Sequence, residues 1–122
     1  MYRLEKSFTF EASHQLPNHD GVCARLHGHS WKGKLILEGC ELHTSGPKAG
    51  MLVDYGDLSK AMEPLLERHL DHRHLNDILT NPTSENVAEW IFHMLKARIQ
   101  ELAAVRIEET CTSAAEYWGD PV

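Results

Sequence analysis

The sequence predicts an α+β fold, with an antiparallel four-stranded sheet and two helices packed on one of its faces. Two N-terminal and two C-terminal segments alternate apolar and polar residues, as half-buried strands do. Two central segments instead repeat apolar residues every three or four positions, as helices do. The order is strand, strand, helix, helix, strand, strand. Because strands and helices are segregated along the chain, we expect an antiparallel sheet with one helical layer.

The first two strands are expected at residues 2–11 and 26–42. Their apolar positions are Tyr2, Leu4, Phe8 and Phe10 in the first strand, and Trp31, Leu35 and Leu37 in the second. The residues that link the two strands favour turns and loops, namely Pro17, Asn18, Asp20 and Gly21. After the second strand we expect a loop at 44–50 and a short extension of the sheet at 51–53.

The first helix is expected at residues 57–70, where apolar residues recur at helical spacing. Asp54 or Asp57 can accept hydrogen bonds from the free N–H groups near its N-terminus. Pro64 interrupts the pattern, because proline removes one backbone hydrogen bond and crowds the preceding turn. We therefore expect either a kink or a helix that restarts at this residue.

The second helix is expected to begin at Thr83 or Ser84, either of which can serve as its N-cap. Its predicted apolar face consists of Val87, Ile91, Met94, Leu95, Ile99 and Leu102. Two short strands at 104–109 and 114–118 then complete the sheet. A sheet of four strands has open edges that must be covered or paired, so we expect oligomerisation through them.

Composition favours one soluble globular domain over residues 1–122, with 42% hydrophobic and 25% charged residues. Twelve basic residues against eighteen acidic ones give a net charge of −6, which argues against a general nucleic-acid binder. No apolar run approaches the ~20 residues of a membrane-spanning helix. Three cysteines without a Cys-x-x-Cys pair, and no apolar N-terminal segment, indicate a cytoplasmic location.

Three histidines predict a metal site. His27 and His29 lie two residues apart on an expected strand, so their side chains point to the same face. His14, at the end of the preceding strand, can supply a third imidazole. Three nitrogen ligands leave one coordination position open, which suits catalysis and makes zinc the default metal. The alternative is that these histidines are half-buried and bond only to backbone groups.

Cys23 precedes His27 by four residues in a turn-rich segment. Near a metal its thiol pKa would fall, and the thiolate could then act as a base or nucleophile. A small buried residue and a fourth metal ligand are the alternatives. Farther along, the neighbours Asp71 and His72 can form a proton-transfer pair, or can simply be polar residues that follow a helix.

Two further segments carry carboxylates. Glu85 follows Thr83 and Ser84, and this segment is typical of a helix N-terminus. Glu108 and Glu109 fall at the end of a predicted strand, where one carboxylate can accept a pair of N–H bonds from an amidine-like ligand. The alternative for both glutamates is ordinary surface charge.

Taken in order, these segments resemble the 6-pyruvoyl-tetrahydropterin synthase family, and most closely its bacterial carboxy branch. The matching segments are Phe8–His14, Cys23–Ser30, Leu70–His72, Leu75–Asp77, Pro82–Asn86 and Glu109–Thr112. The resemblance implies the tunnelling fold (T-fold) of two strands, two helices and two strands. It also implies a homohexamer built from two stacked trimers, with active sites between subunits.

The resemblance implies a role for each matching residue. It makes His14, His27 and His29 the zinc ligands, and Cys23, Asp71 and His72 catalytic residues. Glu85 and Glu109 would hold the pterin ring, with Thr83, Ser84 and Thr110 nearby, and Glu109 would also take part in catalysis. The implied reaction converts 7,8-dihydroneopterin triphosphate to 6-carboxy-5,6,7,8-tetrahydropterin, acetaldehyde and triphosphate, in queuosine biosynthesis.

Three alternative functions remain open on the sequence. One is the pyruvoyl branch of the family, which forms 6-pyruvoyl-tetrahydropterin from the same substrate. A second is an aldolase or epimerase acting on dihydroneopterin. The third is a non-catalytic module that binds zinc or pterin through the same histidines, although such a module would need neither Cys23 nor the Asp71–His72 pair.

Overall fold

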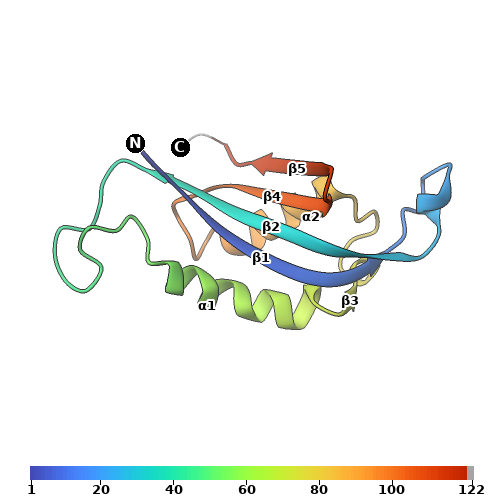
Figure 1. The fold of residues 1–122 in the computed structure, drawn as a ribbon, viewed down its shortest axis with the longest axis horizontal. Coiled ribbons are helices and arrows are strands. Elements are labelled where there is room, and N and C mark those ends of the chain that lie inside the picture. Colours follow the sequence, from blue (N-terminus) through green and yellow to red (C-terminus); the bar gives the residue numbers. More distant parts are fainter. Residues whose placement is uncertain (121–122) are drawn as a thin grey trace.

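A five-stranded sheet with helices against one face forms the fold (Figure 1). The computed structural model describes residues 1–120, so the last two residues of the predicted domain 1–122 lie outside the described part. The strands are β1 (Tyr2–His14), β2 (His27–Gly39), β3 (Arg73–His74), β4 (Leu102–Thr110) and β5 (Ser113–Trp118). Their order across the sheet is β3-β1-β2-β4-β5, so the two long N-terminal strands lie near its centre.

The prediction of a purely antiparallel four-stranded sheet is wrong in one detail. β3 adds a fifth strand and runs parallel to β1, with Ala12 opposite Arg73 and Ser13 opposite His74. The other three strand pairs are antiparallel, as expected. A strand of two residues is too short to show an alternating pattern, and it forms because the chain returns along the free edge of β1.

The first helix, α1 (Tyr55–Leu65), begins two residues earlier than predicted. The side chain of Asp54 caps it by accepting a 2.8 Å hydrogen bond from the backbone N–H of Gly56. Pro64 lies inside the helix, and the chain continues from it into a π-helical turn, η2 (Leu66–Leu70). The disturbance expected at Pro64 therefore takes the form of a wider helical turn, because proline removes one backbone donor.

The second helix, α2 (Ser84–Leu95), is capped by Thr83, whose Oγ1 accepts a 3.2 Å hydrogen bond from the N–H of Asn86. The predicted apolar face of this helix extended beyond the residue at which the helix ends. Ile99 is buried beyond the end of the helix, and Leu102 is the first residue of β4. Both are core residues, so their spacing alone could not separate the helix from the following strand. The predicted strand at 51–53 is also absent.

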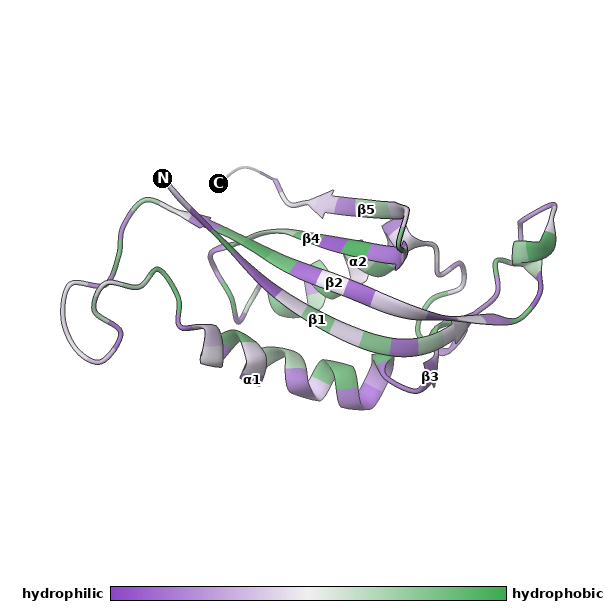
Figure 2. Cartoon of the chain, in the orientation of Figure 1, coloured by the Kyte–Doolittle hydropathy of each residue, from purple (hydrophilic) through white to green (hydrophobic). Residues whose placement is uncertain are grey.

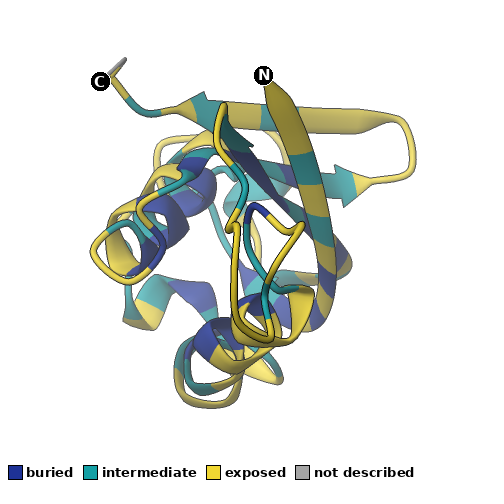
Figure 3. Ribbon diagram, turned by 90° about the vertical axis from the view of Figure 1, so that its left-hand side faces the viewer, coloured by how far each residue is buried: buried dark blue, intermediate teal, exposed yellow. Residues whose placement is uncertain are grey.

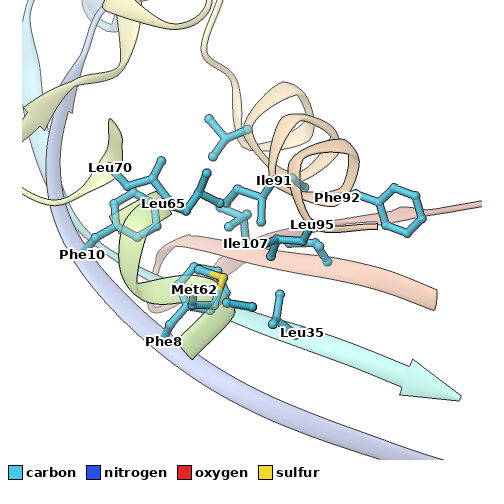
Figure 4. Close-up of a cluster of buried hydrophobic side chains, with 14 of the residues drawn as sticks. Phe8, Phe10, Leu35, Met62, Leu65, Leu70, Ile91, Phe92, Leu95 and Ile107 are labelled. Atoms are coloured by element: carbon cyan, nitrogen blue, oxygen red, sulfur yellow. The ribbon is translucent and has the colours of Figure 1, made fainter. Parts of the chain in front are cut away.

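The core lies between the helices and one face of the sheet (Figures 3 and 4). Large side chains of both layers fill it, among them Phe8, Phe10, Trp31, Leu35, Met62, Ile91 and Ile107. In β1, Phe8, Phe10, Ala12 and His14 are buried, and the residues between them are exposed or half-buried. In Figure 2 the long strands correspondingly carry both hydrophobic and hydrophilic residues along their length. His14 thus belongs to the helix-covered face of the sheet.

Candidate metal centre

The register of β1 and β2 brings three imidazoles together. His14 is the direct cross-strand partner of His27, and Ala12, two residues earlier, is the partner of His29. Cross-strand partners share a face of the sheet, so the three rings gather on one side. Their centroids lie 4.4 Å apart for His14 and His27, 5.1 Å for His14 and His29, and 4.8 Å for His27 and His29. The structure therefore brings the three histidines close together, as predicted.

Two backbone carbonyls orient these rings. Nδ1 of His14 donates to the carbonyl oxygen of Pro82 at 2.8 Å, and Nδ1 of His27 donates to that of Arg25 at 2.7 Å. A ring that carries its proton on Nδ1 presents the lone pair of Nε2, which is the form that binds a metal. Trp31 packs edge-on against His14 and His29, with its own N–H bonded to the carbonyl of Ala12.

Glu109 of β4 completes the group. Its Oε1 lies 3.0 Å from Nε2 of His14 and 3.3 Å from Nε2 of His29. One ligand atom from each of His14, His27, His29 and Glu109 lies within 4.8 Å of the other three. Glu109 occupies the position after Glu108, which is paired with Lys32 across β2 and β4. Alternation then places Glu109 on the same face as the histidines.

The donor set fits a divalent cation. Nε2 of His14 and Nε2 of His29 are buried and make no aligned hydrogen bond, although the Glu109 oxygen lies close to both. Buried polar atoms without a partner are costly, and a metal ion bound by their lone pairs would satisfy them. Burial lowers the pKa of His14, which favours the neutral, metal-binding form of the ring, while the Pro82 carbonyl and the Glu109 charge act in the opposite direction.

Cys23 lies outside this group among the described residues. It belongs to a short 3₁₀ turn, η1 (Val22–Ala24), in the connection that leaves His14 and returns to His27. Its backbone carbonyl accepts a 2.9 Å hydrogen bond from the N–H of Leu16, and its side chain is a half-buried free thiol. The geometry therefore gives no support to a fourth metal ligand at this position.

Asp71 and His72 lie at the edge of β1. Asp71 Oδ2 contacts His72 Nδ1 at 3.0 Å, and Asp71 Oδ1 accepts the N–H of Glu11 at 2.9 Å. That backbone bond, and next the contact with His72, lower the pKa of Asp71. His72 has a φ of 57°, a left-handed conformation that is uncommon for a residue other than glycine. Its N–H donates to the carbonyl of Glu11, which helps to hold this strained backbone.

Within one chain, His72 lies outside the metal group, beside a hollow that reaches one of its histidines. His72 lines an open hollow of about 640 Å³ together with His29 of the metal group and with Glu11, Ser13 and Ser30. Those three positions alternate with the buried residues of β1 and β2, so they lie on the face opposite to the metal group. In a single chain the Asp71–His72 pair is therefore not part of the metal group, although the hollow beside His72 extends to His29.

The residues expected around a pterin ring lie at the start of α2 and the end of β4. Ser84 Oγ donates to Glu109 Oε2 at 3.5 Å, which links the two elements. Thr83 serves as the helix cap, Glu85 is exposed in the first turn, and Thr110 Oγ1 lies 3.3 Å from Thr112 Oγ1 in the following turn. The carbonyl of the preceding Pro82 holds His14, so this segment touches both the metal group and Glu109.

Comparison with known proteins identifies the family. Residues 3–120 match the family model described as 6-pyruvoyl tetrahydropterin synthase. The chain belongs to this family. The 6-carboxy-5,6,7,8-tetrahydropterin synthase of Synechocystis is 47% identical over 97% of this chain and 94% of its own length. The Haemophilus influenzae protein of the same name is 30% identical over 96% of this chain and 99% of its own.

A solved structure supports the same assignment. The 6-pyruvoyl tetrahydropterin synthase of Caenorhabditis elegans superposes with a TM-score of 0.83 at 32% identity, covering 98% of this chain and 96% of that one. The resemblance inferred from the sequence motifs is therefore confirmed, as is the expectation of an enzyme. The predicted fold type is also confirmed, apart from the additional parallel strand. No helix in residues 1–120 is long and apolar enough to cross a membrane.

Sequence reasoning missed three contributors to the site. The carbonyls of Arg25 and Pro82 carried no signal, because every residue type has the same carbonyl group. Glu109 was expected to hold a ligand but not to approach the metal group. Its parity carried a signal, because Val105 and Ile107 are buried core residues of the same strand and Glu109 is next in that series.

Proposed function

We propose that this chain is a zinc-dependent 6-carboxy-5,6,7,8-tetrahydropterin synthase of queuosine biosynthesis. It converts 7,8-dihydroneopterin triphosphate and water to 6-carboxy-5,6,7,8-tetrahydropterin, acetaldehyde and triphosphate. The observation that carries the proposal is the cluster of His14, His27 and His29, in which the Nε2 atoms of His14 and His29 are buried without an aligned hydrogen bond, in a chain 47% identical to a synthase of that name. Three free cysteines in the described residues are in keeping with a cytoplasmic enzyme.

In this proposal each side chain has a defined task. The three histidines would hold a zinc ion, which as a Lewis acid would polarise the oxygens of the substrate side chain and make the adjacent C–H bonds more acidic. Cys23, as a thiolate, removes and returns the carbon-bound proton. Asp71 orients His72, which exchanges protons with the substrate side chain. Glu85 and Glu109 position the pterin ring, with Thr83, Ser84 and Thr110 beside them.

The placement of Asp71 and His72 supports an active site shared between copies of the chain. In one chain neither residue belongs to the metal group, so a pair that acts at this group would come from a partner subunit. The sheet also has free edges among the described residues, since β1 is paired on its outer side only at residues 12–13 and β5 pairs only with β4. Sheets joined through such edges would give the proposed homohexamer of two trimers.

Incubation with 7,8-dihydroneopterin triphosphate, followed by product identification by mass spectrometry, tests the proposed function. We expect 6-carboxy-5,6,7,8-tetrahydropterin together with acetaldehyde. Formation of 6-pyruvoyl-tetrahydropterin without acetaldehyde would instead assign the chain to the pyruvoyl branch, a candidate favoured by the likeness to the C. elegans enzyme. Zinc binding without turnover of this substrate would indicate a non-catalytic module.

A further inference from the structure

The side-chain amide of Asn76 pairs with the main chain of Gln15, the residue that follows His14. Asn76 Oδ1 accepts the Gln15 N–H at 2.9 Å, and Asn76 Nδ2 donates to the Gln15 carbonyl oxygen at 2.9 Å. We propose that Asn76 is a positioning residue, which anchors the Cys23 connection (residues 15–26) and so holds the Cys23 thiol in its place for catalysis. This inference rests on the proposed function, because it takes Cys23 to act on the substrate.

Asn76 supplies this pairing where the main chain beside it cannot. β3 ends at His74, and the chain then turns into a short 3₁₀ helix, η3 (Leu75–Asp77). The Leu75 carbonyl accepts N–H groups from the residues that follow this turn, so it points away from pairing with β1. A side-chain amide carries an N–H donor and a C=O acceptor, as a peptide group does. The Asn76 amide thus continues the strand pairing by one more residue.

Asn76 is itself held firmly enough to act as an anchor. The preceding residue, Leu75, is fully buried in the core, and Asn76 is half-buried. Only one orientation of the amide matches both the N–H and the carbonyl of Gln15, so the two hydrogen bonds also fix the Asn76 side chain. Partial shelter from water strengthens both bonds.

The anchored group leads directly to Cys23. The N–H of Leu16 donates to the carbonyl oxygen of Cys23 at 2.9 Å. This N–H and the Gln15 carbonyl, which accepts from Asn76, belong to the same peptide group, and a peptide group is planar and rigid. Rotation of this one group would break its bonds to Asn76 and to Cys23 together. The position of the Cys23 backbone therefore depends on the amide of Asn76.

Little else holds the Cys23 connection. None of its residues is buried, and its apolar side chains Val22 and Leu26 are exposed, so core packing does not fix it. Within residues 1–120, its hydrogen bonds to the rest of the chain are made at Gln15 and at Arg25, whose carbonyl accepts from Nδ1 of His27 at 2.7 Å. Its other hydrogen bonds stay inside the connection. Loss of the Asn76 amide should therefore release one of its two ends.

Hydrogen exchange of the zinc-loaded protein, read residue by residue by mass spectrometry, tests the anchor without reference to turnover. In the wild type we expect the amides of Gln15 and Leu16 to exchange more slowly than those of Asn18 and Asp20, in the exposed part of the same connection. Equal rates would overturn the proposal, whether or not any variant folds.

Variants of Asn76 then show whether its amide provides this protection. We expect Asn76→Ala to speed exchange at Gln15 and Leu16 by about 10-fold or more, because both hydrogen bonds are lost. Asn76→Asp keeps the acceptor for the Gln15 N–H and loses the donor, so its rates should lie between. The control is Gly33→Ala, which destabilises the sheet against the Phe8 ring and leaves the anchor intact. Equal exchange in Asn76→Ala and the wild type would contradict the proposal.

Steady-state kinetics with 7,8-dihydroneopterin triphosphate distinguish positioning from folding. We expect kcat of Asn76→Ala to fall by about 10- to 100-fold, since a displacement of about 1 Å can cost that much. KM and zinc content should stay near the wild-type values, because the residues proposed to hold the pterin and the metal are unchanged. Asn76→Asp should recover part of kcat, and Gly33→Ala should keep it.

Two outcomes separate this inference from the proposed function. Wild-type kcat in Asn76→Ala, despite faster exchange at Gln15, would show that the anchor has only a structural role and would overturn the proposal. Lack of product already in the wild type would instead refute the proposed synthase activity, while the exchange rates would still show whether Asn76 anchors the Cys23 connection.

Discussion

His14 and His27 are direct cross-strand partners at the end of the β1–β2 pair, and their ring centroids lie 4.4 Å apart. The metal group therefore depends on strand register as much as on residue type. A slip of one residue would turn every side chain of one strand to the other face and scatter the imidazoles. The long ladder between β1 and β2, from Tyr2–Gly39 to His14–His27, holds this register.

Loss of one imidazole should remove the metal. We expect His29→Ala to contain far less zinc than the wild type and to lose activity by about 100-fold or more, beyond the loss typical for residues that only orient a ligand. Zinc content by elemental analysis and product formation check this. The control is His43→Ala, an exposed histidine of the loop after β2. Equal zinc content in His29→Ala and the control would refute the assignment.

Cys23 should matter for turnover but not for metal binding. We expect Cys23→Ala to keep its zinc and to lose about 10²–10⁴-fold in turnover, the usual contribution of a general base. Steady-state kinetics and elemental analysis check this, with the exposed Cys111→Ala as the control. Near wild-type turnover in Cys23→Ala would show that its thiol is not the base, whereas loss of zinc would revive its role as a ligand.

Two inactive variants should complement each other if the active site is shared. Cys23→Ala and His72→Ala subunits, each inactive alone, are refolded together in equal amounts. A site that takes these residues from different chains is intact in about a quarter of cases, so we expect about a quarter of wild-type activity. No recovery in mixed oligomers, verified by differently tagged subunits, would place both residues of each site on one chain.

Gly33 provides a test of packing in the sheet. It lies opposite Phe8, and a Cβ added there would come within 2.1 Å of the Phe8 ring. We therefore expect Gly33→Ala to lower the free energy of unfolding by about 1–3 kcal/mol, measured by urea denaturation. Gly28→Ala is the matched control in the same strand, because its Cβ would meet nothing closer than 3.7 Å. Equal stabilities of the two metal-free variants would contradict the packing argument.

Asp71 should contribute to stability in a pH-dependent way. The Glu11 N–H, and then His72, hold its pKa below the ordinary value of 3.8 in the folded chain. A carboxyl group with a lowered folded pKa stabilises the protein above its unfolded pKa, and this contribution is lost as the pH falls through the folded pKa. We expect Asp71→Asn to be less stable than the wild type at neutral pH, with the difference shrinking below about pH 4.

Urea midpoints measured from pH 3 to pH 7 check this prediction for Asp71. The control is Asp20→Asn, in the exposed turn that follows β1. A difference between Asp71→Asn and the wild type that stays constant over this range would show that the effect does not come from ionisation of Asp71.

Local patterns predicted most of the secondary structure. Alternation located β1, β2, β4 and β5, and spacing located α1 and α2, because each of these signals comes from residues close together in the chain. The errors occurred where the local signal was weak or ambiguous. β3 has two residues, and Ile99 and Leu102 continued a helical spacing after the helix had ended.

The sequence by itself determined the family, the two-layer fold and the three histidines, since motif order and periodicity can be read along the chain. Only the tertiary structure decided that Glu109, eighty residues after His29 in the printed numbering, approaches the same metal group. It also decided that His72 lies outside the metal group, beside a hollow that His29 also lines. The reason is physical: such contacts depend on strand register, on which face each residue occupies, and on backbone carbonyls that every residue type supplies alike.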